Sequence, residues 1–464
     1  MHEALGKPPI MLVDNWPIAP PMVVVASHEI AEQLTRPSKG YQYSVPKSRS
    51  VDSIINNEEW KLVRKRFNPG FAPQHLMTLL PVIVEKTMPY LDVLNEFVRT
   101  GKEFPFDRPT TNLTFDVIGA VTMGEDMSAQ HLDPSRQGKL IVMFKEMVKT
   151  YVDDKIPLPW WLMPRVHLRR HRLGTRISQQ LRRIVRRKFD EMRAGAVDTR
   201  SRSILTLSLQ YIQSLTPEIM EETCDQLKTF LFAGHDTTST TITWSMYELS
   251  RTPRALKAVH DELDELFGPG AARDPAVIRE KLLGPKGDEL VHRMTYISAV
   301  IKEVLRLYPP AGSVRFTKPG TGLVVSAPQG DYNVDGNWLY INHNIIHRDR
   351  TIFGDTADDF VPERWLQSDG AGIPASAWRP FERGPRSCIG LELANIEARV
   401  IIAMLASRYE FVKVGLGEMA LDEDGQPMVD DKGRFEAKTE LYSTIQITSK
   451  PVDGMLMKVK LLGK

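Results

Sequence analysis

The sequence predicts a mainly α-helical protein with a minor β part. Stretches with apolar residues at helical spacing fill the middle of the chain, and one of them runs for more than thirty residues, from Thr216 to about Leu249. Short apolar runs of strand type occur near both ends. Because these strands come from both ends, we expect a single interleaved domain over residues 1–464 rather than two domains in series.

Composition narrows the class of protein. The 464 residues are 42% hydrophobic and carry a formal net charge of +2, so the chain can build a large core and its overall charge does not indicate nucleic-acid binding. Its two cysteines, Cys224 and Cys388, exclude a disulfide framework and a multi-cysteine zinc site, and they indicate a reducing compartment. No run reaches the ~18 apolar residues of a membrane span, and the N-terminus lacks a signal-peptide pattern.

The chain begins with strands and then turns helical. Two short apolar runs bounded by turn residues, Pro9–Val13 and Met22–Val25, predict an early hairpin. A short helix is expected at His28–Leu34 and a loop at Ser38–Val51. A cap residue followed by acids opens a helix at Asn57. Further helices are expected over His75–Arg99, Thr110–Met123, Gly138–Tyr151, Leu168–Arg193, Arg254–Phe267 and Arg293–Leu307, with a surface loop at Gly195–Arg202.

The C-terminal part contributes more strands. After Pro309-Pro310 the pattern is strand- and turn-like as far as Ile345. Two later runs, Glu440–Thr448 and Met455–Leu461, flank the turn sequence Pro451–Gly454. We therefore expect these two runs to pair as a hairpin.

The decapeptide Phe381–Gly390, Phe-Glu-Arg-Gly-Pro-Arg-Ser-Cys-Ile-Gly, carries the strongest functional signal. Its cysteine precedes helical spacing over Leu391–Ser407, and the positive end of a helix dipole favours a thiolate. Gly384 and Gly390 permit backbone conformations and close approaches that a Cβ would prevent, while Arg386 offers a fork suited to a carboxylate. A thiolate in such a loop is what a cysteine-ligated haem iron requires, and the alternative is a buried structural cysteine.

The pattern Phe-x-x-Gly-x-Arg-x-Cys-x-Gly resembles the haem-binding loop of the cytochrome P-450 family of haem-thiolate monooxygenases. The resemblance implies that Cys388 is the axial ligand of the iron of haem b (iron protoporphyrin IX). It also implies that Phe381, Gly384, Arg386 and Gly390 surround the haem. The fold it implies has a large helical region and a smaller β-rich region around a buried haem.

The long helix contains a second motif, Ala233-Gly234-His235-Asp236-Thr237-Thr238. A glycine in mid-helix costs about 1 kcal/mol, so it needs a reason such as a planar ligand at close approach and a local opening of the helix. The segment resembles the oxygen-activating motif of the family, which implies that Ala233 and Gly234 contact the haem. It implies further that Asp236 and Thr237 are catalytic and manage protons. The alternative is helix packing through a small-residue notch, and His235 is expected to be a packing or surface residue.

Other short segments also match motifs of the family. Glu303 and Arg306 precede Pro362-Glu363-Arg364-Trp365, which implies a structural Glu303–Arg306–Arg364 triad.

Trp60 and Arg64 share a helical face and resemble the Trp-x-x-x-Arg of the family, while Arg315 matches a basic residue after Glu-x-x-Arg. The resemblance implies that these three residues, together with Arg386, bind the haem propionates. Taken alone, a solvated arginine and a core tryptophan are the alternatives. The resemblance spans nearly the entire chain.

The resemblance implies a monooxygenase that uses O2 and oxidises a lipophilic small molecule. No dinucleotide or flavin fingerprint is present, so NADPH acts indirectly through a separate flavoprotein reductase, for which Lys61, Lys65 and Arg66 are candidate docking residues. The alternatives are a haem-thiolate isomerase or dehydratase that needs no oxygen, and a non-catalytic haem-binding remnant.

The expected substrate pocket is largely apolar and draws on Phe230, Ala233, Ala311, Gly312, Val314 and the Val452–Met455 turn. The sequence as a whole is similar to fungal monooxygenases of secondary metabolism, and we expect a monomer.

The chain opens about where the first β-hairpin of the family begins, so the N-terminal anchor and first helix of microsomal members are expected to be absent. The resemblance implies the endoplasmic reticulum surface, and the lack of a spanning segment leaves the cytoplasm open. Pro157–Trp161 fits either peripheral membrane contact or a core-packed loop. The basic run that follows does not indicate nucleic acid, because it is one helical segment of a balanced chain.

Overall fold

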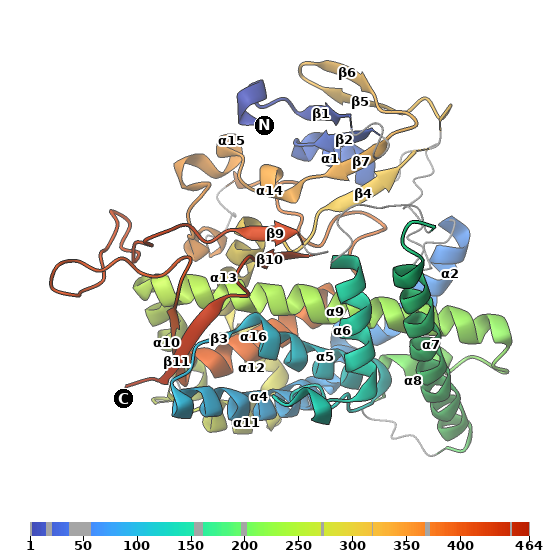
Figure 1. Ribbon diagram of the computed structural model, residues 1–464, viewed down its shortest axis with the longest axis horizontal. Helices are drawn as coiled ribbons and strands as arrows, with labels where there is room; N and C mark the ends of the chain where they lie inside the picture. The colour runs from blue at the N-terminus through green and yellow to red at the C-terminus, as the bar shows by residue number, and fades with distance from the viewer. Residues whose placement is uncertain are drawn as a thin grey trace. The chain divides into compact units, whose positions relative to one another are not determined.

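The computed structural model describes residues 2–14, 21–36, 57–152, 161–195, 202–270, 273–317, 319–366, 372–445 and 448–463. The chain forms two compact units, each built from two separate segments (Figure 1). The smaller unit contains Met1–Arg64 and Lys302–Leu391, and the larger contains Lys65–Ile301 and Glu392–Lys464. Each unit thus combines N-terminal and C-terminal sequence, while a single domain over the whole chain stays a prediction.

A four-stranded sheet organises the smaller unit. Its order is β1 (Ile10–Val13), β2 (Met22–Val25), β7 (Trp338–Ile341) and β4 (Ser313–Phe316). The predicted early hairpin is confirmed, because β1 and β2 pair antiparallel with Ile10 opposite Val25. Strand β2 then pairs parallel with β7, which lies some three hundred residues further along the chain.

The apolar face of this sheet packs against α1 (His28–Thr35), which Ser27 caps by accepting the backbone N–H groups of Glu29 and Ile30. Buried Ile30 and Leu34 share one core with Leu339 of the sheet. The unit also holds the larger part of α2 (Asn57–Phe67), the β5 (Val324–Ala327) and β6 (Gly330–Asn333) pair, α14 (His343–Ile346) and α15 (Arg350–Phe353).

The larger unit is mainly helical and is built around α9 (Pro217–Arg251), which α5 (Asp107–Met123) accompanies (Figure 1). Thr216 caps α9 by accepting the N–H of Ile219, and Pro217 occupies the first turn as predicted. The remaining helices are α3 (Pro73–Thr78), α4 (Leu80–Thr100), α6 (Lys139–Val152), α7 (Pro164–Arg193), α8 (Ile204–Leu209), α10 (Pro253–Phe267), α11 (Pro275–Leu283), α12 (Gly287–Arg293) and α16 (Leu391–Ala406). The first half of α13 (Thr295–Leu307) also belongs to this unit, and its second half, from Lys302, belongs to the smaller one. The expected single helix over His75–Arg99 is therefore two helices, since Leu79 separates α3 from α4.

The predicted C-terminal hairpin is wrong. Strand β11 (Leu456–Leu461) pairs antiparallel with β8 (Tyr409–Lys413) and with β3 (Phe104–Pro105), while β9 (Ser443–Ile445) pairs with β10 (Ser449–Pro451). After the turn that follows β10, β11 pairs with strands that are distant in the sequence. The residues of a turn do not indicate such distant partners.

No helix within the described ranges is both long and apolar enough to cross a membrane. The predicted loop at Ser38–Val51 and most of the segments Pro157–Trp161 and Gly195–Arg202 lie outside the described residues.

Candidate functional site

The predicted Phe381–Gly390 loop is closed by backbone hydrogen bonds just before α16. The N–H of Cys388 donates to the carbonyl of Phe381 at 2.8 Å, and the N–H of Ser387 donates to that of Gly384 at 3.0 Å. Gly384 has φ 78°, and a Cβ at this position would lie 2.1 Å from the carbonyl oxygen of Thr35. Only glycine therefore fits this turn without displacing the end of α1.

Cys388 is exposed, whereas Cys224 is buried. Neighbouring atoms still desolvate the Cys388 sulfur enough to raise the pKa of its thiol, although the N–H of Gly390 and the charge of Arg64 act in the opposite direction. The N–H at the start of the helix thus acts towards the thiolate, as expected, but desolvation outweighs it in the protein by itself. A bound metal cation would deprotonate a coordinating thiol.

The structure brings the four predicted propionate-binding residues together in the smaller unit. The Arg386 guanidinium lies 4.0 Å from the ring centroid of Trp60, and that of Arg64 lies 6.0 Å from it. Arg64 Nη1 also donates to the carbonyl of Ser387 at 3.0 Å. Desolvation, followed by the charges of Arg315 and Arg64, lowers the pKa of Arg386 to about 10.

These residues fit a haem group. The loop offers a sulfur donor on an exposed residue, and three guanidinium groups converge closely enough to perturb one another. The two carboxylates of a haem would neutralise such a cluster. Gly390 lies beside the sulfur, since a Cβ there would be in ordinary van der Waals contact with Cys388 Sγ at 3.9 Å.

A buried ion pair that the sequence analysis missed supports this loop. Glu382 has φ 57°, a conformation unusual for a residue with a side chain, and its Oε1 lies 2.5 Å from Nη2 of fully buried Arg379. Burial acts to raise the pKa of Glu382, but the nearby His343 ring, with Nε2 3.6 Å from Glu382 Oε2, and the charge of Arg379 outweigh it and lower the pKa to about 2. Arg379 also donates to Thr35 Oγ1 at 3.0 Å, which ties the loop to α1.

The predicted Glu303–Arg306–Arg364 triad is present in the smaller unit. Glu303 and Arg306 are fully buried, and two hydrogen bonds of 2.8 and 2.9 Å join them. Arg364 Nε donates to Glu303 Oε1 and Trp365 Nε1 donates to Oε2, at 3.0 and 2.9 Å. Arg306 also donates to the carbonyls of His347 and Asp359. Because these buried groups hydrogen-bond to one another and to the backbone, we interpret the triad as structural.

In the larger unit, α9 is helical throughout its length and has an open patch at its middle. Ala233 is exposed and Thr237 is half-buried, whereas the residues from Thr238 to Leu249 are buried. The Thr237 hydroxyl donates to the carbonyl of Ala233 at 2.8 Å. A Cβ at Gly234 would lie 2.6 Å from the Ile118 side chain, so this glycine has the packing role that the sequence left open.

Asp236 is buried, and both of its carboxylate oxygens are engaged. Lys450 Nζ lies 2.5 Å from Oδ1, and Thr448 Oγ1 donates to Oδ2 at 2.5 Å. Burial acts to raise the pKa of Asp236, yet the charges of Lys450 and His235 and these hydrogen bonds lower it overall. No sequence signal pointed to Lys450 or Thr448, because they come from the distant β10 segment.

Two smaller expectations concern the same helix. His235 is a packing residue, as predicted, with its ring against Phe115 at 5.3 Å between centroids and Nδ1 at 2.6 Å from the Leu231 carbonyl. Phe230 was expected in the substrate pocket, but it is buried against Phe67 and Phe71 at 5.2 and 5.1 Å between ring centroids.

A cavity of about 690 Å³ connects Lys450 with solvent. Its walls include Asp107 and Arg108 at the start of α5 and Lys145 on α6. Desolvation raises the pKa of Asp107 to about 6 and lowers that of Lys145 to about 8. Titratable groups with these values can exchange protons near neutral pH.

Of the three candidate docking cations, Arg66 is already used within the larger unit. It lies 3.7 Å from Glu222 and donates to Thr223 Oγ1 at 3.1 Å. Lys61 and Lys65 are exposed.

Comparison with known proteins matches the chain to one family. A family model described as Cytochrome P450 matches residues 8–429. The chain is 30% identical over 485 residues to "Cytochrome P450 monooxygenase acrF" of Aspergillus aculeatus, covering 96% of this chain and 93% of that one. It is 28% identical to a "Bifunctional cytochrome P450/NADPH--P450 reductase" of Gibberella moniliformis, covering 84% of this chain and 34% of that one. A crystal structure of a cytochrome P450, CYP102L1, matches with a TM-score of 0.76 at 19% identity, over 99% of this chain and 96% of that one.

Proposed function

Because the chain belongs to the cytochrome P450 family, in which its relative acrF is named a monooxygenase, we propose that it is a haem-thiolate monooxygenase acting on a lipophilic small molecule. The observation that carries the proposal is the exposed Cys388 with Trp60, Arg64, Arg315 and Arg386 gathered beside it. The bound haem would supply oxygen activation, with the thiolate favouring cleavage of the O–O bond.

The residues of the smaller unit would hold the cofactor. Cys388 provides the axial sulfur, and the closed Phe381–Gly390 loop fixes its position. Arg64, Arg315 and Arg386 would bind the two propionates. Arg64 also donates to the loop itself, so cofactor binding and loop position depend on the same guanidinium.

The residues of the larger unit would manage protons. Thr237 Oγ1 lies at the open patch of α9 and would deliver a proton from there, while Asp236 would hold the next proton. Asp236 can accept that proton only when Lys450 releases it, because the ion pair favours the carboxylate. The cavity lined by Asp107, Lys145 and Lys450 would supply protons from solvent.

Electrons would come from an NADPH-dependent flavoprotein, as the fused reductase of the Gibberella relative suggests. The exposed Lys61 and Lys65 are the remaining candidates for docking an acidic partner. The Aspergillus relative supports a fungal type of enzyme, and we keep secondary metabolism as the proposed setting.

The reduced protein in carbon monoxide should show the far-red-shifted Soret band of thiolate ligation. Cys388→Ser should lose this band, and its retention would overturn the assignment. Thr237→Ala should keep the band but consume NADPH with less product, and unchanged coupling would remove the proton role of Thr237. Turnover that needs no oxygen would instead identify an isomerase or dehydratase.

A further inference from the structure

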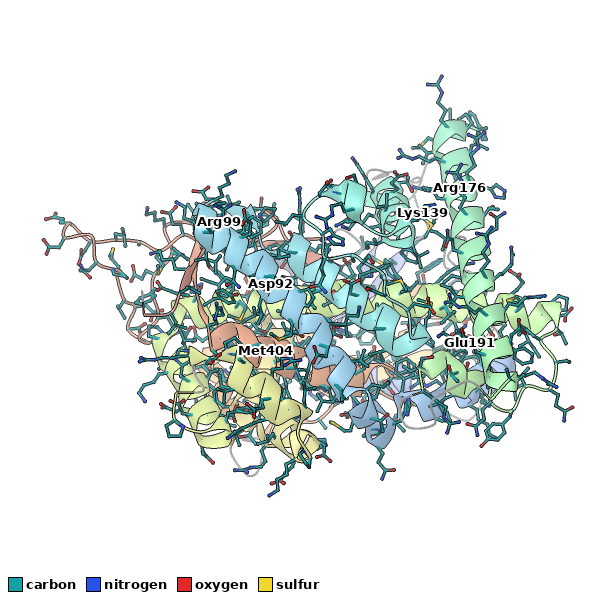
Figure 2. The ribbon with its side chains drawn as sticks, turned by 90° about the horizontal axis from the view of Figure 1, so that it is seen from below. Asp92, Arg99, Lys139, Arg176, Glu191 and Met404 are labelled. Atoms are coloured by element: carbon teal, nitrogen blue, oxygen red, sulfur yellow. The ribbon has the colours of Figure 1, made fainter. Side chains whose placement is uncertain are left out.

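The cavity of about 690 Å³ beside Lys450 is built wholly by residues of the larger unit. It reaches from the end of α4 to α6, and Figure 2 marks these two helices by Arg99 and Lys139. Its α5 wall is tied to α9 by a hydrogen bond of 3.2 Å from Thr111 Oγ1 to Ser239 Oγ. A space of this volume can hold a small molecule.

Two cations on the wall of this cavity lack a salt bridge. Arg108 on α5 and Lys145 on α6 both line the cavity, and among the described residues neither forms an ion pair. Lys145 Nζ donates to the neutral side-chain oxygens of Asn112 and Gln137, at 2.6 and 3.1 Å. Desolvation, followed by the charge of Arg108, lowers the pKa of Lys145 to about 8. An anion bound between the two cations would offset their repulsion.

The acids of the wall leave one formal positive charge over. Two of them already pair with cations outside the wall, as Glu103–Lys458 and Glu146–Arg169, at 3.2 and 3.4 Å. The charge of Lys450 is neutralised by Asp236. The third acid, Asp107, can balance the charge of either Arg108 or Lys145 but not of both. The occupant that fits this balance is therefore a monoanion.

Part of the wall is apolar. The rings of Phe97 and Phe104 stack with 3.8 Å between their centroids, and both residues line the cavity. Leu132 lines it as well and is 52% exposed, so a ligand with an apolar body would remove this side chain from water. Apolar surface next to cations suits a carboxylic acid with a ring, whereas an inorganic anion would leave the apolar surface uncovered.

We propose that this cavity binds a small organic monoanion, a carboxylic acid with an aromatic or alicyclic body. Its carboxylate lies between Arg108 and Lys145, and its body contacts Phe104 and Leu132. Arg108 supplies the planar fork that matches a carboxylate, and Lys145 adds a second, compact charge. Binding in this cavity involves no step of the oxidation chemistry, so it does not rest on the proposed function.

The test is calorimetric titration of the haem-loaded full chain with cinnamate, at low salt. Cinnamate should bind, and cinnamamide, which has the same shape without the charge, should bind about tenfold more weakly or worse. Arg108→Gln and Lys145→Gln should each weaken cinnamate binding by about tenfold or more and should leave cinnamamide binding unchanged, since each removes a charged hydrogen-bond donor to the carboxylate. Inorganic phosphate that binds as tightly as cinnamate would overturn the proposal of an organic ligand.

A matched control removes two exposed cations of α4 and α6 that do not line the cavity, as Arg99→Gln and Lys149→Gln together. It should bind cinnamate as the wild type does. Equal losses in this control and in the double variant of Arg108 and Lys145 would mean that net charge alone is responsible and would overturn the proposal.

Two further results would overturn it. One is that the wild type does not bind cinnamate. The other is that cinnamate shifts the Soret band and binds all variants alike, which would assign it to the haem pocket instead. The carbon monoxide spectrum of each variant reports the haem site separately, so failure of this proposal is distinguishable from failure of the proposed function.

Discussion

Lys450 holds Asp236, with Nζ 2.5 Å from Oδ1, so the predicted proton-handling acid is half of a buried ion pair. The acid lies on α9 and the lysine on β10. Since Lys450 also lines the cavity of about 690 Å³, it lies between solvent and Asp236. The charge of this lysine lowers the pKa of Asp236 and so makes protonation of the carboxylate less favourable.

Lys450→Met should raise the pKa of Asp236, because burial of the carboxyl is then no longer opposed by the main neighbouring charge. If Asp236 relays protons as a carboxylate, lowering the pH should reduce the amount of product formed per NADPH consumed. This decrease should begin at a higher pH in the variant than in the wild type. The pH profile of this coupling ratio measures the effect. Lys458→Met, which removes an exposed lysine paired with Glu103, should leave the profile unchanged. Identical profiles for Lys450→Met and wild type would contradict the role of Lys450.

Glu303→Gln should destabilise the fold strongly. The substitution leaves the buried Arg306 and Arg364 facing a neutral amide, and breaking a buried ion pair in this way typically costs about 3–5 kcal/mol. Denaturant unfolding gives the change in free energy. Glu289→Gln is the control, because this exposed acid pairs loosely with Arg293 at 3.8 Å and should change stability by less than about 1 kcal/mol. Similar losses in both variants would show that the triad is not a stabilising centre.

The sequence predicted the parts of the site whose chemistry is local. The Cys388 loop has a distinctive short pattern, whereas the Glu303 triad and the role of the Trp60–Arg64 pair were implied by the resemblance of short motifs to the family. Lys450 and Arg379 could not be predicted in the same way, because each acts on a carboxylate through tertiary pairing and has no distinctive local pattern.

The same limit applies to the fold. The β1–β2 hairpin and α9 follow from local apolar spacing and caps, and both were predicted. The partner of β11 is β8, which lies more than forty residues earlier in the sequence, so local pattern favoured the wrong hairpin. The pKa of the Cys388 thiol could not be predicted from sequence spacing either. It depends on desolvation, which raises the pKa, and on the Gly390 N–H and the charge of Arg64, which lower it.

Arg386→Gln should accelerate loss of haem. Arg386 is the member of the cation cluster nearest the Trp60 ring, and a hydrogen bond to a charged group contributes about 1.5–3 kcal/mol, which corresponds to about a tenfold or larger change in retention. The rate of haem transfer to an excess of apomyoglobin measures it. Arg383→Gln is the matched control in the same loop, since Arg383 pairs with Glu32 at 3.0 Å instead. Equal transfer rates for Arg386→Gln and the control would argue against propionate binding by Arg386.

Glu382→Gln should remove a pH-dependent part of the stability. The folded pKa of Glu382, about 2, is depressed from the ordinary value of 4.5, so its contribution is fully present above pH 4.5 and is lost as the pH falls towards 2. A depression of this size corresponds to roughly 3 kcal/mol. The difference in free energy of unfolding between wild type and Glu382→Gln should therefore be largest at neutral pH and should shrink in acid. Asp331→Asn, at an exposed site of the same unit, should show no such trend. A difference that stays constant with pH would mean that Arg379 stabilises the loop without the charge of Glu382.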